Sequence, residues 1–281
     1  MYHLPTSKCL QVFVGHECNG EGGGVTAGSF TPDGKFALTI GMDGTLRIWA
    51  PRTGMCRHVF KLSDDGDDAG PAALTCLAVD GGIDGQLAIA GGESGNAYVV
   101  HLYGKKVIAT LRHFDTPATS SANADDEAML ITSVEAVGFA SKTVNMNWIA
   151  TGGSDGTVKI WDLTFDGGQC RQICAVKDEA KETGAHASTG GITRVSWHPT
   201  QPIIFASYSD GAVRLWDARN GVLVHTLTGG KHDNQINDIS VEVFGTEQGP
   251  GTAIVITAND DGSTKVFTVD IAAVLAQSQQ A

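Results

Sequence analysis

One short motif recurs five times along the chain and constrains its fold more than any other feature. Each copy is a turn, in most copies Asp-Gly, followed by a short apolar run that ends at an anchor residue. The anchors are 51, 61, 55 and 51 residues apart. Such a period indicates a repeat architecture in which every repeat is one supersecondary unit. The copies are MDGTLRIWA (42–50), ESGNAYVVHL (93–102), SDGTVKIWDL (154–163), SDGAVRLWDA (209–218) and DDGSTKVFTV (260–269).

Strand patterns surround each copy of the motif. Upstream of each anchor, segments such as VTAGSFTPDGKFALTIG and ITRVSWHPTQPIIFASYS predict two short strands joined by a polar turn. Downstream, CRHVFKL, KVIATLRH, CRQICAV and VLVHTLT predict a fourth strand. Four antiparallel strands per repeat form the blade of a β-propeller. The sequence therefore predicts an all-β propeller, with a helix expected only in the tail VDIAAVLAQ.

The anchor motifs identify the type of propeller. IW, IWD and LWD end three of the predicted third strands, and Gly15-His16 precedes the first repeat, so the chain resembles WD40-repeat proteins. Val100 and Phe267 replace the anchor tryptophan in two repeats, where we expect the usual side-chain network to be missing. The expected network residues are His16, Asp43, Trp49, Asp155, Trp161, His186, Asp210, Trp216, His232, Thr257 and Asp261.

The repeat spacing also divides the chain into units. We expect an outer strand at 1–16, blades at 17–62, 63–113, 114–176, 177–228 and 229–269, and a tail at 270–281. The last blade ends after its third strand and could borrow Lys8 to Val14 as its fourth, which would close a ring of five. We favour instead five blades of a larger ring of seven or eight, because Tyr2-His3 resembles the stump of a third strand.

Residue types of a hydrolase triad occur twice, as His232, Thr257 and Asp261 and as His186, Ser207 and Asp210. A catalytic triad needs one copy, whereas this set recurs with the repeat, so a structural role is the better interpretation. His113 is a candidate for the histidine of the third blade. We expect no catalytic residue, no cofactor and a chain that is not an enzyme.

The six cysteines are scattered, and only Cys170 and Cys174 lie close together. Their spacing is one residue longer than that of a redox pair, and no second pair completes a zinc site. We interpret both as buried or half-buried cysteines on a strand and expect no metal. The start of the chain does not resemble a secretion signal. A cytoplasmic location is expected, with a nuclear one open.

The net charge of −12 argues against direct binding to nucleic acid, which needs a basic footprint, and no apolar run could span a membrane. Fourteen of the 31 acidic residues fall in the loops between blades, which share the top face of a WD40 propeller. Acids that serve only solubility are the alternative. Arg52, Lys105, Lys106 and Arg219 fall on the opposite face, so the charge is polarised. The expected partner-binding acids are Glu17, Glu21, Asp64, Asp65, Asp67, Asp68, Asp125, Asp126, Glu127, Asp178, Glu179, Glu182 and Asp233, and Asp115 completes the loop set.

The whole chain also resembles the angio-associated migratory cell protein family, through GKFALTIGMDGTLRIW, GNAYVVHLYGKKV, DGAVRLWDARNG and STKVF. The resemblance implies a dedicated chaperone, because fungal members capture the basic end of a new large-subunit ribosomal protein on an acidic propeller top. We therefore expect a monomeric binding platform with a basic client that acts in ribosome assembly. The alternative is a WD40 adaptor, such as a ubiquitin-ligase receptor subunit.

Overall fold

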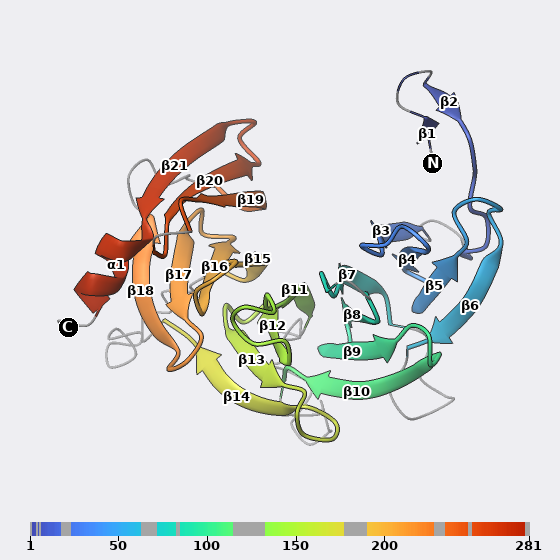
Figure 1. The fold of residues 1–281 in the computed structure, drawn as a ribbon, viewed down its shortest axis with the longest axis horizontal. Helices are drawn as coiled ribbons and strands as arrows, with labels where there is room; N and C mark the ends of the chain where they lie inside the picture. The colour runs from blue at the N-terminus through green and yellow to red at the C-terminus, as the bar shows by residue number, and fades with distance from the viewer. Residues whose placement is uncertain are drawn as a thin grey trace, which may run out of the picture. The chain divides into compact units, whose positions relative to one another are not determined.

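The computed structural model describes residues 2–3, 5, 7–17, 24–62, 72–82, 85–114, 133–176, 190–227, 234–246 and 249–278. The chain divides into two compact units, Met1–Val134 and Glu135–Ala281. Each unit is built from antiparallel sheets whose strands follow one another in sequence (Figure 1). The propeller architecture predicted from the repeats is confirmed by these sheets.

The first unit holds two four-stranded sheets and a short hairpin. In the hairpin, Tyr2 pairs with Cys9 and His3 with Lys8, so the strand expected along Lys8–His16 is confined to its first two residues. The strands are β1 (Tyr2–His3), β2 (Lys8–Cys9), β3 (Val25–Phe30), β4 (Ala37–Gly41), β5 (Thr45–Trp49), β6 (Cys56–Lys61), β7 (Leu74–Val79), β8 (Leu87–Gly92), β9 (Asn96–His101) and β10 (Lys106–Arg112).

The second unit holds two four-stranded sheets, one three-stranded sheet and a terminal helix. Its first strand, β11, begins at the last residue of the first unit. The elements are β11 (Val134–Phe139), β12 (Trp148–Gly153), β13 (Val158–Asp162), β14 (Gln169–Cys174), β15 (Ile192–Trp197), β16 (Ile203–Tyr208), β17 (Val213–Asp217), β18 (Val222–Leu227), β19 (Ile236–Phe244), β20 (Thr252–Asn259), β21 (Thr264–Asp270) and α1 (Ile271–Ser278).

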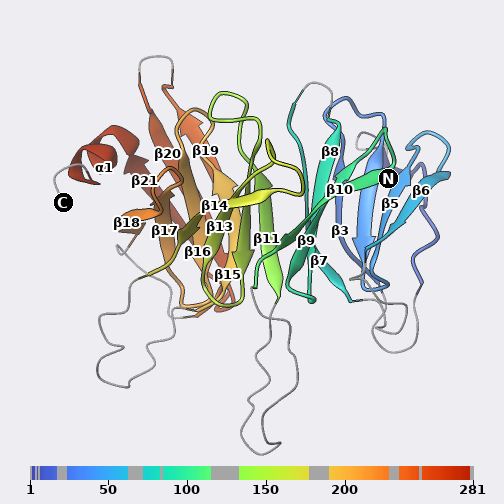
Figure 2. The same cartoon turned by 90° about the horizontal axis from the view of Figure 1, so that it is seen from below.

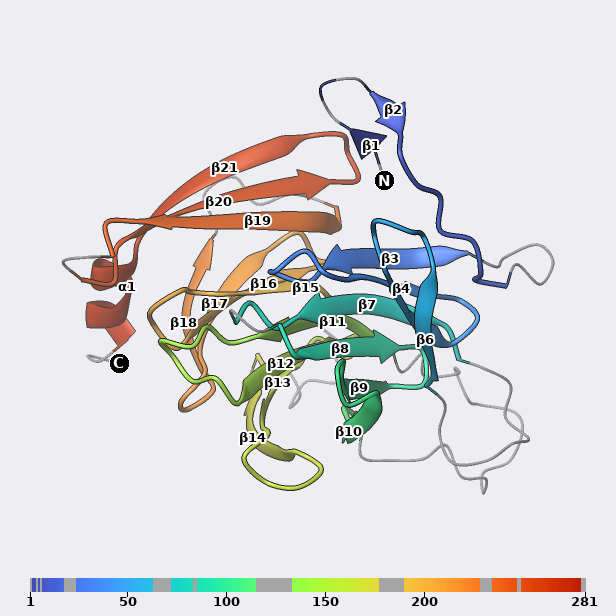
Figure 3. The ribbon, with the colours of Figure 1, turned by 45° about the vertical axis from the view of Figure 1, so that its right-hand side comes forward.

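The last sheet ends after its third strand, as expected from the sequence (Figure 3). The predicted tail helix is confirmed as α1, which lies against β18, β20 and β21 (Figure 2). The Asp270 carboxylate caps α1 by accepting the backbone N–H groups of Ala272 and Ala273 at 3.0 and 3.2 Å. Ile271 and Val274 of the helix are buried in the core of this unit.

Burial is concentrated in the middle strands of the four-stranded sheets. In β4, β8, β12 and β16 nearly every residue is buried, which is why these strands are almost continuously apolar. The outermost strands, such as β6 and β14, are mostly exposed. The middle strands supply the core between sheets, as in the cluster that joins Leu38 and Ile40 of β4 to Ala88 of β8 and Tyr98 of β9.

Candidate protein-binding surface

The recurring turn joins the second strand to the third strand in all five sheets. Its glycine has a positive φ of 67 to 80° at Gly44, Gly95, Gly156, Gly211 and Gly262, a conformation that glycine adopts at little cost. The residue before the glycine accepts a hydrogen bond from the backbone N–H two residues ahead, through a carboxylate at four turns and through the Ser94 hydroxyl at the other. These side chains hold the turns in one shape.

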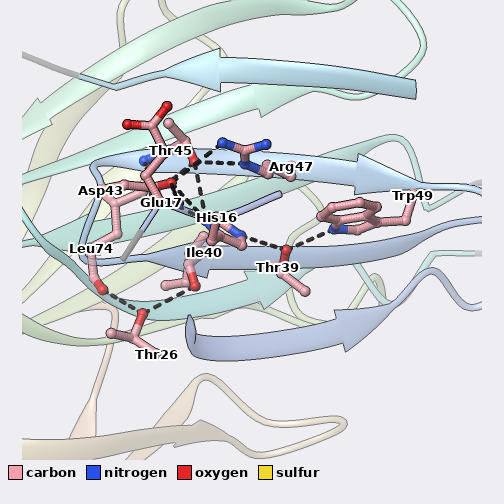
Figure 4. Close-up of polar contacts among 10 residues, drawn as sticks. All are labelled: His16, Glu17, Thr26, Thr39, Ile40, Asp43, Thr45, Arg47, Trp49 and Leu74. Carbon is pink, nitrogen blue, oxygen red and sulfur yellow. Dashed lines mark hydrogen bonds and ion pairs between the residues drawn. The ribbon is translucent and has the colours of Figure 1, made fainter. Parts of the chain in front are cut away.

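The first sheet contains a complete chain of side-chain hydrogen bonds (Figure 4). The Trp49 indole Nε1–H donates to Thr39 Oγ1 at 2.7 Å, and Thr39 Oγ1 lies 2.7 Å from His16 Nε2. His16 Nδ1 lies 3.0 Å from Asp43 Oδ1. Because the carboxylate can only accept, His16 donates from Nδ1 and accepts the Thr39 hydroxyl at Nε2. The predicted residues His16, Asp43 and Trp49 therefore come together, with Thr39 as an additional member.

Asp43 is the acid of this network, and its carboxylate accepts several hydrogen bonds. Burial raises the pKa of its carboxyl, but hydrogen bonds from the Thr45 side chain, the Glu17 backbone and His16 outweigh burial and lower it overall. The Arg47 guanidinium lies 3.4 Å from the same carboxylate. Asp43 is thus a structural anion whose charge is already paired, not a free site for a client.

The third sheet repeats the indole bond. Trp161 Nε1–H donates to Thr151 Oγ1 at 2.8 Å, and Asp155 accepts the Thr157 hydroxyl and backbone N–H at 2.9 Å. His113, the candidate histidine of this network, is buried directly after β10 and belongs to the first unit. Thr39 and Thr151 each precede their tryptophan by ten residues, and this spacing is the signal that sequence reasoning missed.

The fourth sheet uses a different acceptor from the predicted one. Trp216 Nε1–H donates to the Tyr208 hydroxyl at 3.0 Å, whereas Ser207 lies 2.7 Å from the Thr193 hydroxyl. Adjacent residues of a strand point to opposite faces, so Ser207 cannot share the face of Trp216. The placement of Ser207 in this network is therefore wrong, and the buried Tyr208 takes the role. His186 lies outside the described residues.

Asp210 of the fourth sheet is paired within its own hairpin. The Arg214 guanidinium lies 2.6 Å from the Asp210 carboxylate and stacks 4.3 Å above the Tyr208 ring. The pair is only partly exposed, and its geometry resembles that of Arg47 and Asp43 in the first sheet. Two of the turn aspartates are thus neutralised by an arginine four residues ahead.

The two sheets without an anchor tryptophan differ from this pattern. Val100 is buried but has no donor, so the indole bond cannot form there. In the last sheet Phe267 stands at the anchor, and the Thr257 hydroxyl donates to the Lys265 carbonyl at 3.5 Å. Asp261 is exposed and accepts the Ser263 N–H at 2.7 Å, while His232 lies outside the described residues.

Of the predicted partner-binding acids, Glu17 is the member that falls within the described residues. Its side chain is exposed, and its backbone N–H donates to Asp43 Oδ2 at 3.0 Å, which fixes it beside the first recurring turn. The others lie outside the described residues: Glu21, Asp64, Asp65, Asp67, Asp68, Asp125, Asp126, Glu127, Asp178, Glu179, Glu182 and Asp233, together with Asp115 of the same loop set.

Charge differs between the two ends of the sheets. At the recurring turns, Glu93, Asp155, Asp260 and Asp261 are exposed. At the turns between third and fourth strands, Arg52, Lys105 and Lys106 are exposed, together with one acid, Asp166. Arg219, also exposed, binds Asp217 at 2.6 Å.

The two close cysteines have different environments. Burial raises the pKa of the Cys174 thiol to about 12, so this side chain is an inert core residue. Cys170 is exposed on the outer strand β14, so the expectation that it is at least half-buried is wrong. Among the described residues, no three His, Cys, Asp or Glu side chains are grouped to hold a metal ion. No helix of the described chain is long and apolar enough to cross a membrane.

Repeated four-stranded sheets, anchored tryptophans and bonded Asp-Gly turns identify WD40 repeats in this chain, the repeat from which many protein-binding scaffolds are built. The WD domain, G-beta repeat family matches residues 7–50, 136–162 and 179–217. The chain is 31% identical over 269 residues to the angio-associated migratory cell protein of Homo sapiens. The aligned region covers 96% of this chain and 53% of that protein. The predicted resemblance to this protein is confirmed.

Two further relatives show the same partial coverage. An uncharacterized WD repeat-containing protein of Schizosaccharomyces pombe is 26% identical over 273 residues, or 94% of this chain and 55% of the relative. The target of rapamycin complex subunit LST8 of Mus musculus is 23% identical over 194 residues, or 69% and 48%. The chain thus spans about half the length of the curated relatives that it matches.

Proposed function

We propose that this scaffold is a dedicated chaperone that captures the basic segment of a large-subunit ribosomal protein on the acidic end of its sheets during ribosome assembly. The protein acts by binding and not by catalysis. The main support for the proposal is the net charge of −12, with 14 of the 31 acidic residues in the loops that precede the first strand of each repeat. The similarity to angio-associated migratory cell protein supports it.

The described structure supports the electrostatic part of the proposal. Asp43 and Asp210 are paired with arginines, so the turn acids that remain exposed, together with Glu17 and the loop acids, supply the attraction. An acidic surface steers a basic segment toward itself and raises its association rate, an effect that salt screens. Charge-assisted hydrogen bonds from lysine and arginine then hold the segment.

A WD40 adaptor is the second candidate. The observation in its favour is the similarity to a relative whose name describes a subunit of the target of rapamycin complex. An adaptor would copurify with the other subunits of one complex, such as a ubiquitin ligase, and not with ribosomal proteins. Affinity purification followed by mass spectrometry separates the two functions.

The direct test measures binding of a fluorescent 15-residue peptide rich in lysine and arginine at several salt concentrations. Changing Asp64, Asp65, Asp67 and Asp68 to asparagine raises the net charge by four. If each exposed ion pair contributes about 0.2–1 kcal/mol, affinity should fall at least about fourfold and its dependence on salt should weaken. Unchanged affinity would remove this loop from the site.

A matched control separates a local site from overall charge. Asp166→Lys combined with Glu242→Lys also raises the net charge by four, at exposed positions away from the recurring turns. The control should retain most of the affinity. An equal loss in both variants would mean that the peptide responds to net charge alone, and the proposed site would be abandoned.

A further inference from the structure

The first unit carries a basic surface at the ends of its sheets opposite the recurring turns. Arg52 lies in the turn before the outermost strand β6, and Arg57 lies on that strand. Lys105 and Lys106 lie at the corresponding place in the next sheet, where β10 begins. All four side chains are exposed, and we call them the basic rim.

Contacts within the unit fix the turn that carries Lys105. The Tyr103 hydroxyl donates to Asp33 Oδ2 at 3.3 Å, and the Tyr103 ring packs edge-on against Phe36 with centroids 5.6 Å apart. His101 Nδ1 accepts the Gly104 N–H at 2.8 Å. The turn that carries Lys105 is therefore fixed against the turn between β3 and β4 of the first sheet.

Asp33 and Asp80, which lie between the first and second strands of the two sheets, already accept hydrogen bonds. Asp33 accepts hydrogen bonds from the Thr31 hydroxyl at 2.7 Å and the Lys35 backbone at 3.0 Å, and its carboxylate lies 2.9 Å from the Lys35 ammonium. Asp80 accepts the Gly82 N–H of its own turn, between the first two strands of its sheet. No acid among the described residues forms an ion pair with Arg57 or Lys105, so both charges are available for an incoming anion.

Apolar side chains are interleaved with the basic ones. Met55, Val59, Tyr103 and Val107 are between 37 and 58% exposed, and each is a near neighbour in sequence of a rim residue. Such a surface suits a ligand that combines negative charge with aliphatic side chains. Nucleic acid is disfavoured because Tyr103 is the single exposed aromatic ring among these side chains, so the surface offers little on which bases could stack.

We propose that the basic rim is a second docking surface, distinct from the acidic client site, and that it binds an acidic protein segment in which Asp or Glu alternates with Leu, Ile or Val. In the first unit, the exposed acids Glu17 and Glu93 lie at the recurring turns, at the other ends of the same sheets. A basic client and an acidic partner therefore bind without competing.

His58 provides an internal reporter of an anion at the rim. It is half-buried on β6, and burial and the positive charge of Lys105 both lower its pKa. A carboxylate bound beside Lys105 screens that charge and adds attraction to the imidazolium, so the pKa of His58 rises. NMR titration of His58 with and without the ligand measures this change directly.

The experiment uses the full chain and a fluorescent peptide of alternating Glu and Leu residues, with single-stranded RNA of equal charge as the competing probe. Lys105→Glu with Lys106→Glu should weaken peptide binding about tenfold or more, because two attractive charges become repulsive. The control is Lys61→Glu with Arg112→Glu, which makes the same charge change at the other ends of β6 and β10. The control should bind within about twofold of the native protein.

Three outcomes overturn the proposal: no binding of the peptide by the native chain, an equal loss in both double variants, or tighter binding of the RNA than of the peptide. A pKa of His58 that stays constant on binding also contradicts it. The asparagine variant of the Asp64–Asp68 loop should bind the acidic peptide at least as well as the native chain. Failure of the client site and failure of the basic rim are thus distinguishable.

Discussion

Replacing Thr39 by valine should destabilise the protein more than any other loss of a single hydroxyl in the first unit. Valine has nearly the same shape as threonine but has no hydroxyl. The change removes the acceptor of the Trp49 indole and the donor to His16 Nε2, both at 2.7 Å. Trp49 is 1% exposed and the His16 side chain 5% exposed, so water does not readily replace either bond.

The expected magnitude follows from two buried polar groups that lose their partners. Each such group costs about 1–3 kcal/mol, so Thr39→Val should lower the free energy of unfolding by about 2–6 kcal/mol. For a chain of 281 residues that corresponds to a fall in Tm of roughly 3–10 °C. The effect should shrink by about 1–2 kcal/mol in a Trp49→Phe background, because the indole donor is then already gone.

Urea unfolding followed by circular dichroism measures the change, with the Trp49 indole proton followed by hydrogen exchange. Thr110→Val on β10 is the control, because it makes the same chemical change at an exposed strand position and should stay within about 0.5 kcal/mol. If both variants have the same stability, the hydrogen-bond chain contributes nothing measurable. The assignment of its energy to Thr39 would then be refuted.

Three further predictions concern the second unit. Tyr208→Phe should cost about 1–3 kcal/mol in thermal unfolding, because the buried Trp216 indole loses its acceptor, and a cost near zero would mean that another acceptor replaces it. Burial lowers the pKa of His198, so stability should decline as pH falls through the ordinary histidine range, and His198→Gln should flatten the pH profile of the urea midpoint. Iodoacetamide at pH 8 should label Cys170 but not Cys174 in the folded protein, as read by mass spectrometry, and equal labelling would contradict the burial of Cys174.

The fold could be predicted from the sequence because its determinants are local. The Asp-Gly turns, the anchor tryptophans and the alternation of short apolar strands are visible in one dimension, and the third strands appear where they were expected. The acceptor of Trp216 could not be predicted, because sequence spacing alone does not show that Ser207 faces away while the larger Tyr208 reaches the indole. The burial of Cys170 was predicted wrongly because most side chains of the outer strand β14 are exposed to solvent.

The candidate surface was less predictable than the fold. Loop acids such as those of Asp64–Asp68 have no periodicity. The sequence therefore places them between strands but does not predict the direction in which their carboxylates point. The structure instead identifies which turn acids are unavailable, since Asp43 and Asp210 are paired with Arg47 and Arg214. That distinction depends on an ion pair between an aspartate in the turn and an arginine four residues later. The net charge of the chain does not reveal such pairs.

The placement of the tryptophans determines which sheets report on unfolding through intrinsic fluorescence. All five lie in three sheets: Trp49 in the first, Trp148 and Trp161 in the third, Trp197 and Trp216 in the fourth. The sheets anchored at Val100 and Phe267 contain no indole. Intrinsic tryptophan fluorescence therefore does not report directly on the second and fifth sheets. An unfolding transition that changes the circular dichroism but not the fluorescence would show that one of these two sheets opens first.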